Sequence, residues 1–418
     1  MPGSKDILPR GAQGRNRMEY HEIIIVGAGA SGLMCGYLLG RQGRDVCILD
    51  KNETAGKKLA ATGNGRCNYT NQNMSPACYY GDRKYVEHIL ERFGPEDAIT
   101  LFGELGILTR EKEGYCYPYN GQAATVREHL VQGCLESGVV FSYNTKVAKI
   151  LHKKEEAYEL RCGGGAIYQC RCLILATGGR ANGPLGGDGS GYKLCRSMGH
   201  RVTPVLPGLT GLKAEGSEWK QLAGIRMQGK IALYGDGLLL GEEAGEIQIV
   251  KDGISGIPVF QLCRLAAEAM EQGKKVTGKI DFIPQMTGSQ LEEWLIGHGS
   301  RGLSGIVNKK WLPVLTKKGK DPDRLCKVLK EYKVSVSDTF GLEKAQVSAG
   351  GVATEEICAN TMESLLHSDL YLLGELQDVD GICGGYNLHF AWATAVVCSQ
   401  HIIETFAKED KYVTIQPV

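Results

Sequence analysis

The sequence of 418 residues lacks any apolar run as long as the ~18 residues that a membrane-spanning helix needs. It also lacks an excess of charge of one sign, since 48 Lys and Arg residues oppose 47 Asp and Glu residues. This balance gives no electrostatic footprint for nucleic acid or for an anionic membrane. Residues 1–20 lack the apolar core of a signal peptide, and we expect them to form a flexible tail. We therefore expect a cytoplasmic protein without a nucleic-acid or membrane partner.

Cysteine is plentiful, yet the patterns that give it a special role are missing. The 15 cysteines are odd in number and irregular in spacing, and no Cys-x-x-Cys pair occurs. A small secreted disulfide scaffold would look different. We therefore expect mostly buried thiols in a reducing compartment, and we expect no metal site.

A glycine loop near the start predicts a dinucleotide-binding fold. Residues 22–26 read as a buried parallel strand, residues 30–42 as a helix, and residues 45–50 as a second strand. The loop between the first strand and the helix is Gly27-Ala28-Gly29-Ala30-Ser31-Gly32. Such glycines permit a sharp turn, close approach to a pyrophosphate, and tight packing of the helix, whose N-terminus favours phosphate. Asp50 ends the second strand, where an acid commonly bonds a ribose hydroxyl and disfavours a 2′-phosphate.

A second copy of the pattern shows why context matters. Residues 297–302 also fit G-x-G-x-x-G, but they follow a helical stretch, and no acid-terminated strand comes after them. We interpret them as a chance match. Because the chain has no second glycine loop linked to a strand, it does not resemble a disulfide reductase with a separate nicotinamide domain.

Three further segments change the prediction from a dinucleotide to FAD. Residues 56–68 combine lysines, amides and glycines within a long loop expected over residues 52–76. Residues 176–179 close a buried strand, within residues 139–176 that read as a small sheet. Residues 370–388 read as a strand ending at Gly374, then an acid, then a double glycine that opens an apolar helix. A helix start there can stabilise charge on a reduced flavin.

These motifs identify a family resemblance. Residues 56–68, 176–179, 188–192, 348–352, 361–364 and 374–388 occur in the same order in the bacterial FAD flavoproteins grouped as aminoacetone oxidase-like. Gly-Asn-Gly-Arg-Cys-Asn and Gly-Gly-Tyr-Asn-Leu are the most specific strings, and Asp50 departs from the glutamate that is more common there. The resemblance implies an α/β fold with a Rossmann-like FAD-binding domain split in sequence. An inserted β-barrel-like domain and a small helical domain would interrupt it.

The expected division and cofactor contacts follow from these segments. We expect FAD-binding parts at residues 21–200 and 341–418, a β-rich insert at 201–260, and a helical insert at 261–340. Helices are also expected near residues 83–92, 95–105 and 122–137. The residues expected to contact FAD are Gly27, Gly29, Ala30, Ser31, Gly32, Asp50, Lys51, Lys57, Lys58, Gly63, Gly65, Arg66, Cys67, Asn68, Val147, Thr177, Gly178, Gly179, Gly374, Glu375, Asp378, Gly384, Gly385, Tyr386, Asn387 and Leu388.

The resemblance implies two activities that both exchange hydride at flavin N5. One reduces a ring C=C bond conjugated to a 3-oxo group in bile-acid intermediates, with NAD(P)H as donor. The other oxidises a small amine such as aminoacetone with dioxygen.

The reductase needs a group that polarises the ketone and a group that protonates carbon, for which Tyr, His and Arg are suited. Candidates are Tyr117, Tyr115, Tyr386, His389 and Arg66. Each has a structural alternative: Tyr115 and Tyr117 can form a hairpin edge, His389 can pack on its helix, and Tyr386 can shield the flavin.

A third hypothesis is a flavin-bearing protein that acts on RNA. Lys309, Lys310, Lys317, Lys318 and Lys320 make a local basic patch that favours it, whereas the neutral net charge opposes it. We interpret the patch as a solvated surface, with RNA binding as the alternative.

Overall fold

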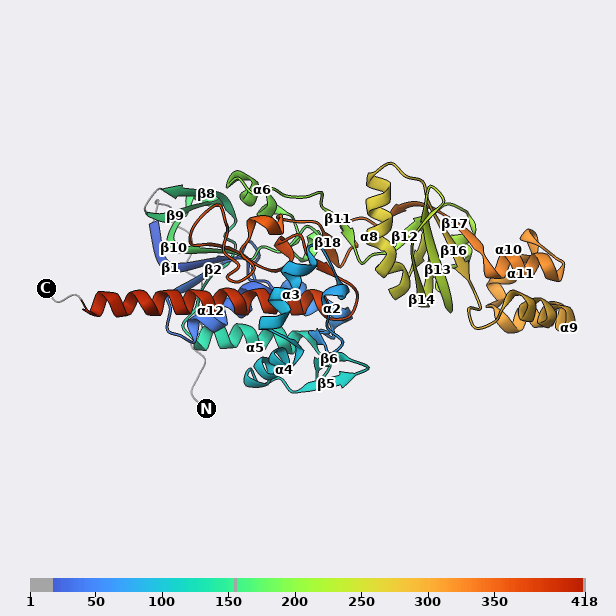
Figure 1. Ribbon diagram of the computed structural model, residues 1–418, viewed down its shortest axis with the longest axis horizontal. Helices are drawn as coiled ribbons and strands as arrows, with labels where there is room; N and C mark the ends of the chain where they lie inside the picture. The colour runs from blue at the N-terminus through green and yellow to red at the C-terminus, as the bar shows by residue number, and fades with distance from the viewer. Residues whose placement is uncertain (1–17, 154–155, 416–418) are drawn as a thin grey trace.

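A seven-stranded sheet forms the centre of the larger part of the molecule. The computed structural model describes residues 18–153 and 156–415 (Figure 1). The strand order is β7-β2-β1-β10-β9-β8, and β19 pairs with the C-terminal half of β10. The bounds are β1 (Met18–Val26), β2 (Val46–Leu49), β7 (Val140–Ser142), β8 (Val147–Lys153), β9 (Glu156–Cys162), β10 (Ile167–Leu175) and β19 (Leu370–Leu372). The parallel pairing of β7, β2, β1, β10 and β19 places the carboxyl ends of these strands at one edge.

Three helices cover the sheet. Helix α1 (Ala30–Gly40) packs against both α5 (Ala123–Glu136) and α12 (Tyr386–Ile415). Nearly every residue of α1 is buried, because neighbours cover it on several sides. The predicted strand–loop–helix–strand unit and the predicted apolar helix after the double glycine are thereby confirmed, and α12 joins the first and last parts of the chain in one core.

Smaller elements complete this part of the molecule. They are α2 (Lys57–Gly65), β3 (Thr70–Asn71), β4 (Tyr79–Tyr80), α3 (Arg83–Arg92), α4 (Pro95–Glu104), β5 (Thr109–Lys112), β6 (Tyr115–Pro118), α6 (Ser190–Ser197) and β20 (Asp380–Gly381). The helices expected near residues 83–92, 95–105 and 122–137 are all present.

Three expectations about local structure were wrong. The loop expected over residues 52–76 contains α2, because Lys57 to Ala61 are good helix formers, whereas Thr62 to Asn64 do leave the helical conformation. The small sheet expected over residues 139–176 belongs to the central sheet, because β10 pairs with β1. Residues 18–20 belong to β1 rather than to a tail, and residues 1–17 lie outside the described residues.

The insert contains a closed six-stranded barrel. Its order is β12 (Leu212–Ala214), β15 (Gly253–Ser255), β14 (Leu238–Val250), β13 (Arg226–Gly235), β16 (Val276–Asp281) and β17 (Tyr332–Thr339). Strands β16 and β17 come from the stretch expected to be helical, so the barrel extends past residue 260. Their period-two burial, as in Val276, Gly278 and Ile280, was the missed signal.

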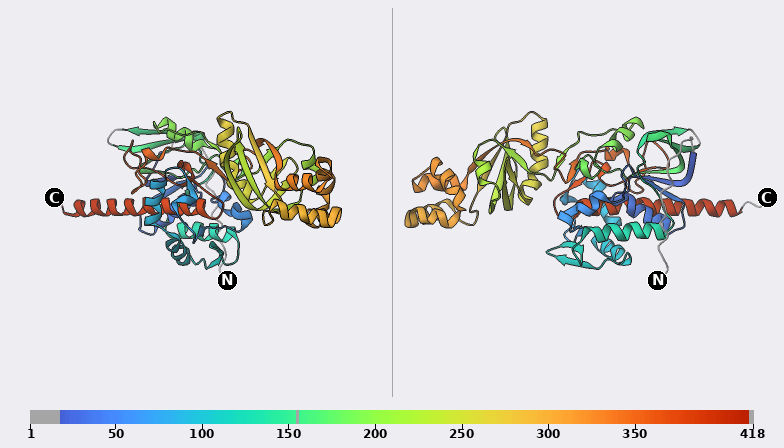
Figure 2. Two further views of the ribbon diagram at one scale, coloured as in Figure 1. Left: turned by 45° about the vertical axis from the view of Figure 1, so that its right-hand side comes forward. Right: turned by 180° about the vertical axis from the view of Figure 1, so that it is seen from behind.

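The insert lies to one side of the sheet part and ends in a helical module (Figures 1 and 2). The module comprises α9 (Gly288–Ile306), α10 (Leu312–Lys318) and α11 (Pro322–Lys330), and α7 (Glu218–Leu222) and α8 (Ile257–Glu271) pack on the barrel. The chain enters and leaves through a two-stranded ribbon of β11 (Leu206–Gly208) and β18 (Val347–Ala349). Across residues 18–153 and 156–415, no helix is both long and apolar enough to cross a membrane.

Candidate active site

The phosphate loop has the shape that a pyrophosphate requires. A Cβ on Gly32 would lie 1.9 Å from the Gly27 carbonyl oxygen, so the start of α1 packs directly on the loop. A Cβ on Gly29 would meet no atom within 4 Å, so the tip of the loop faces open space. Gly29 is the N-cap of α1, and no side chain caps this helix. The first-turn N–H groups therefore remain available to an anion.

Asp50 braces this loop from the end of β2. Its Oδ2 accepts a hydrogen bond of 2.7 Å from the Ala28 N–H, and its Oδ1 accepts from the Asn52 backbone and side chain. The backbone of Thr145 donates to the Asp50 carbonyl oxygen, which brings the start of β8 and buried Val147 close to this acid. Contact of Asp50 with a ribose remains a prediction.

The segment from Gly63 to Asn68 bends back toward the start of α12. Gly63, Asn64, Gly65 and Cys67 all have positive φ angles. Cys67 is fully buried, and this burial raises the pKa of its thiol to about 12, so it is a packed thiol. The Asn68 Oδ1 is buried without a hydrogen-bond donor among the described residues. A Cβ on Gly385 would lie 2.9 Å from that oxygen, so the unsatisfied acceptor lies at the double glycine.

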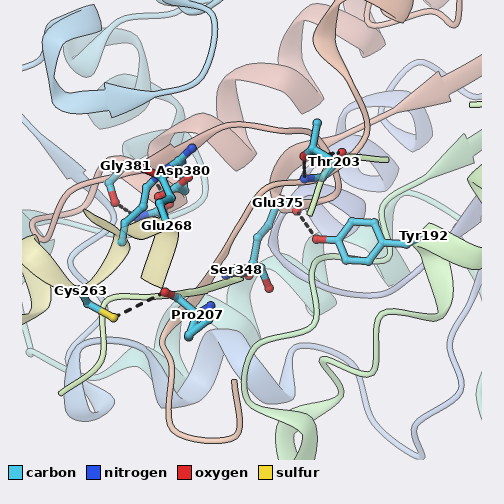
Figure 3. A network of polar contacts seen from close by, with 12 residues as sticks. Tyr192, Thr203, Pro207, Cys263, Glu268, Ser348, Glu375, Asp380 and Gly381 are labelled. Atoms are coloured by element: carbon cyan, nitrogen blue, oxygen red, sulfur yellow. Dashed lines mark hydrogen bonds and ion pairs between the residues drawn. The ribbon is translucent and has the colours of Figure 1, made fainter. Parts of the chain in front are cut away.

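A polar cluster joins residues distant in sequence beside residues 176–179. Lys58 Nζ lies 2.6 Å from Glu375 Oε2, and Glu375 Oε1 accepts a 2.9 Å hydrogen bond from the Ser348 N–H. The Ser348 hydroxyl oxygen accepts from the N–H groups of Arg180 and Ala181, just after Gly179. Figure 3 shows Ser348 and Glu375 near Tyr192, whose hydroxyl donates to the Glu375 carbonyl oxygen at 3.4 Å.

Residues 380–387 form a turn at the start of α12 that several hydrogen bonds hold in place. The Asn387 amide bonds both the N–H and the carbonyl of Gly381, at 2.8 and 2.7 Å. Asn71 Nδ2 donates to the Gly384 carbonyl at 2.9 Å, and Tyr79 donates to the Tyr386 carbonyl. Gly384 and Gly385 have φ angles of 131° and 95°, which favour glycine. Leu388 follows in the first turn of α12.

Four of the predicted catalytic candidates gather beside this turn. Tyr115 and Tyr117 lie on β6, the central strand of the small sheet β3-β6-β5, rather than at its edge. A Cβ on Gly384 would meet the rings of Tyr386 and Tyr115 at 2.9 and 3.0 Å. Arg66 lies close enough to act on the charge of Tyr117, and its side chain is exposed.

The hydrogen bonds of these four candidates distinguish Tyr386 from the other three. Within the part of the chain that the structure describes, the side chains of Tyr115, Tyr117 and Arg66 have no hydrogen-bond or ion-pair partner. Tyr386, by contrast, donates to the Asn73 carbonyl at 3.2 Å. Burial raises the pKa of Tyr117 above its ordinary value, and its hydroxyl is available as a hydrogen-bond donor.

His389 is not brought to this surface. Its ring is fully buried, with Nδ1 2.8 Å from the Thr70 hydroxyl and Nε2 3.0 Å from the Phe93 carbonyl. Burial lowers its pKa to about 4, so the ring is neutral and fully hydrogen-bonded. This geometry favours the packing alternative over a catalytic role.

Several predicted cofactor residues have other partners. Lys51 forms an ion pair of 2.5 Å with Asp188, and Lys57 forms one of 3.2 Å with Glu53. Burial raises the pKa of Asp378, and its Oδ1 has no hydrogen-bond partner among the described residues. The remaining predicted contacts do gather at one place: Thr177 and Gly178 follow β10 beside the phosphate loop, and a Cβ on Gly374 would lie 3.0 Å from the Ser31 hydroxyl.

Sequence reasoning missed several residues of the site. Asn71 and Ser348 bond the turn and the cluster described above, and Ser348 already lay in a noted motif without an assigned role. Arg264 of the insert forms an ion pair with Asp380 beside the double glycine. No local pattern marks Arg264, because it comes from a separate module and meets its partner through the tertiary fold.

The residues of the site fit a bound FAD. The open loop at Gly29 suits the pyrophosphate, the unsatisfied Asn68 oxygen suits an imide N–H of the ring, and the start of α12 suits its pyrimidine edge. The cluster of Arg66, Tyr115 and Tyr117 lies beside these groups and supplies proton donors.

The chain is also similar to known proteins. Residues 21–401 match the family described as HI0933-like protein Rossmann domain. The chain is 38% identical to the 3-dehydro-bile acid delta(4,6)-reductase of Clostridium scindens, over 92% of this chain and 99% of that protein. It is 30% identical to the ribosomal RNA dihydrouridine synthase of Escherichia coli, with the same coverage.

Among solved structures, the 3-ketosteroid delta1-dehydrogenase of Sterolibacterium denitrificans matches with a TM-score of 0.51 and 13% identity. The match covers 93% of this chain and all of that one. At this identity, the likeness concerns the fold.

Proposed function

The chain belongs to the HI0933-like family and is an FAD-dependent oxidoreductase, and we propose that it reduces ring C=C bonds conjugated to a 3-oxo group in bile-acid or steroid-like intermediates. The observation that carries this proposal is the 38% identity, over nearly the full length of both chains, to a reductase of 3-dehydro-bile acids. The cluster of Arg66, Tyr115 and Tyr117 supports it, because it offers donors to a ketone oxygen beside the flavin-facing turn.

The reaction adds one hydride and one proton across the double bond. The reduced form of a bound FAD would supply the hydride, to the carbon farther from the ketone, and would return to oxidised FAD. The chain must then stabilise negative charge on the ketone oxygen and deliver a proton to the nearer carbon. We assign the charge stabilisation to the Arg66 guanidinium and the proton to the Tyr117 hydroxyl, which lies within the electrostatic reach of Arg66.

We further propose that NAD(P)H reduces the flavin at the same open face in alternation with substrate. The chain has a single glycine loop in the strand–helix context of a dinucleotide site, and the second match at Gly297 lies inside α9. Alternation predicts ping-pong kinetics, whereas sequential kinetics with a ternary complex would contradict it.

An anaerobic experiment tests the proposal. The FAD-loaded protein is photoreduced and mixed with a 3-oxo-Δ4 steroid acid, the 3-oxo-Δ4,6 analogue, the saturated 3-oxo acid and aminoacetone. The proposal predicts flavin reoxidation by the two enones alone, with product mass increased by two hydrogens. Oxidised enzyme that aminoacetone reduces, followed by rapid peroxide release with dioxygen, would instead identify the amine oxidase.

A second candidate is reduction of uracil in ribosomal RNA. One relative is named a ribosomal RNA dihydrouridine synthase, and that reaction also reduces a ring C=C bond conjugated to a carbonyl. The specific observation that favours it is the basic patch of Lys309, Lys310, Lys317, Lys318 and Lys320. All five side chains are exposed, and none forms an ion pair with a described residue.

The two candidates separate on RNA binding and on product. An RNA substrate requires affinity that falls steeply with salt, in proportion to the phosphates contacted. It also requires dihydrouridine in a ribosomal RNA transcript incubated with the protein and NAD(P)H, detected by mass spectrometry. Changing all five patch lysines to Gln should abolish that product and leave steroid reduction unaltered.

A further inference from the structure

Helix α8 of the insert lies between the barrel and the flavin-binding part (Figure 1). It packs on β14 of the barrel and on β11, the strand by which the chain enters the insert. The Cys263 thiol donates to the Pro207 carbonyl of β11 at 3.5 Å (Figure 3). The helix is thus attached both to the barrel and to the base of the connecting ribbon.

One contact of α8 is a buried ion pair with the turn before α12. The Arg264 guanidinium pairs with the Asp380 carboxylate, and the two side chains are 14% and 3% exposed. Arg264 Nε also bonds Glu268 at 2.7 Å, and its guanidinium carbon lies 4.8 Å from the centre of the Tyr80 ring. Tyr80 is the partner of Asp380 in the β4–β20 pair, so Arg264 holds both strands of that pair.

A second contact of α8 reaches closer to the double glycine. Gln261 Oε1 accepts a 2.8 Å hydrogen bond from the Cys383 N–H, one residue before Gly384. The turn's other hydrogen bonds, with Cys78, Asn71, Tyr79 and Asn387, come from the flavin-binding part itself. Gln261 and Arg264 are therefore the residues through which the insert contacts the segment that leads into Gly384 and Gly385.

Loss of either contact would free this segment from the insert. Without Gln261, the half-buried Cys383 N–H would lose its acceptor. Without Arg264, the Asp380 carboxyl, whose pKa burial raises to about 7, would stay buried without an opposite charge or take up a proton, and in either case the ion pair is lost. Both residues that would lose a partner lie within five positions of Gly385. A change in the orientation of the insert would therefore move the flavin-facing glycines.

We propose that α8 acts as a bracket through which the insert sets the position of the Gly384-Gly385 turn against the flavin, which makes Arg264 and Gln261 positioning residues for hydride transfer. This proposal rests on the FAD-dependent oxidoreductase and not on the identity of its substrate. It gives the insert a role in the flavin environment: when the insert shifts, the environment of the pyrimidine edge shifts with it.

The test compares Arg264→Met with Arg226→Met in the FAD-loaded full chain. Arg226 is the matched control, because its ion pair with Glu246 is exposed on the same barrel. The readouts are FAD content, the flavin midpoint potential, amide hydrogen exchange of residues 380–385, and kcat and KM for the best acceptor. We expect Arg264→Met to retain FAD and to exchange faster over the turn.

In that variant the potential should shift by about 30 mV, which is a tenfold change for a two-electron couple. We expect kcat to fall about tenfold with KM changed less than threefold. Gln261→Leu should change the same quantities in the same direction, and Arg226→Met should change none.

A double variant separates positioning from loss of stability. Arg264→Met with Asp380→Asn removes the uncompensated buried charge but also removes the bracket. We expect its thermal stability to return toward that of the wild type while the potential and kcat remain altered. Wild-type potential, exchange and kcat in FAD-loaded Arg264→Met, or their full recovery in the double variant, would overturn the bracket. Because the potential and the exchange need no substrate, failure of the proposed reaction would leave this test intact.

Discussion

Substitution of Gly29 by Ser separates the binding role of the phosphate loop from its structural role. A Cβ at this position meets no atom within 4 Å, and the backbone φ of −85° suits any residue. Gly29 is already the N-cap of α1, where Ser is preferred over Gly by a few tenths of a kcal/mol. The apo protein should therefore unfold in urea at the same or a slightly higher midpoint.

The same change should greatly weaken FAD binding. The serine oxygen would accept from a first-turn N–H that the pyrophosphate needs, and its Cβ would occupy the open tip of the loop. Loss of one to two hydrogen bonds to a charged group costs roughly 1.5–3 kcal/mol each. A loss of about 2.7 kcal/mol lowers the affinity about a hundredfold. Titration of apo protein with FAD, followed by flavin fluorescence, measures this change.

Gly32→Ala is the contrasting variant. Its new Cβ would lie 1.9 Å from the Gly27 carbonyl oxygen, so the helix must move away from the loop. Such overpacking costs about 1–3 kcal/mol, and we expect the apo protein itself to lose stability. Wild-type FAD affinity in Gly29→Ser would refute the assignment of this loop to the pyrophosphate.

Three further outcomes are expected. Tyr117→Phe should lower the rate of enone reduction about a hundredfold at unchanged FAD content, since general acids contribute roughly 10²–10⁴; an unchanged rate assigns the proton elsewhere. Lys58→Met, which removes the 2.6 Å pair with Glu375, should weaken FAD binding about tenfold, whereas Lys57→Met, which removes only the 3.2 Å pair with the exposed Glu53, should not. His389 keeps a pKa of about 4 when folded against its ordinary 6.5, so the unfolded state binds the extra proton between these values. Its contribution to stability is present above pH 6.5 and is lost as the pH falls toward 4, by about 3 kcal/mol in all; urea unfolding of His389→Gln should lack this part of the pH dependence.

The parts of the fold set by local pattern were predictable from the sequence. The unit from Ile23 to Asp50 combines a buried apolar strand, a glycine loop and an acid at fixed spacing, and each feature acts within a few residues. The closed barrel was harder, because β16 and β17 are separated by the whole helical module and their pairing depends on tertiary contact. Alternation in Val334 and Val336 was present, but short strands within a helix-rich stretch give a weak signal.

In the site too, features set by local sequence were predictable and those set by tertiary contacts were not. The segments around Gly29, Asn68 and Gly385 were recognisable from residue type and order, and the structure brings them together at the carboxyl edge of the sheet and the start of α12. The orientation of His389 was not predictable, because a histidine four residues after a glycine turn can face either the flavin or the core. Its partners Thr70 and Phe93 lie about 300 residues away, at separations of 319 and 296.

The measurement that tests the central claim most directly is the anaerobic reaction of photoreduced, FAD-loaded protein with a 3-oxo-Δ4 steroid acid. The account predicts that the flavin is reoxidised and that the saturated 3-oxo acid appears in equal amount, with two added hydrogens. The saturated ketone should leave the flavin reduced. Flavin that stays reduced with every enone tested would contradict the account.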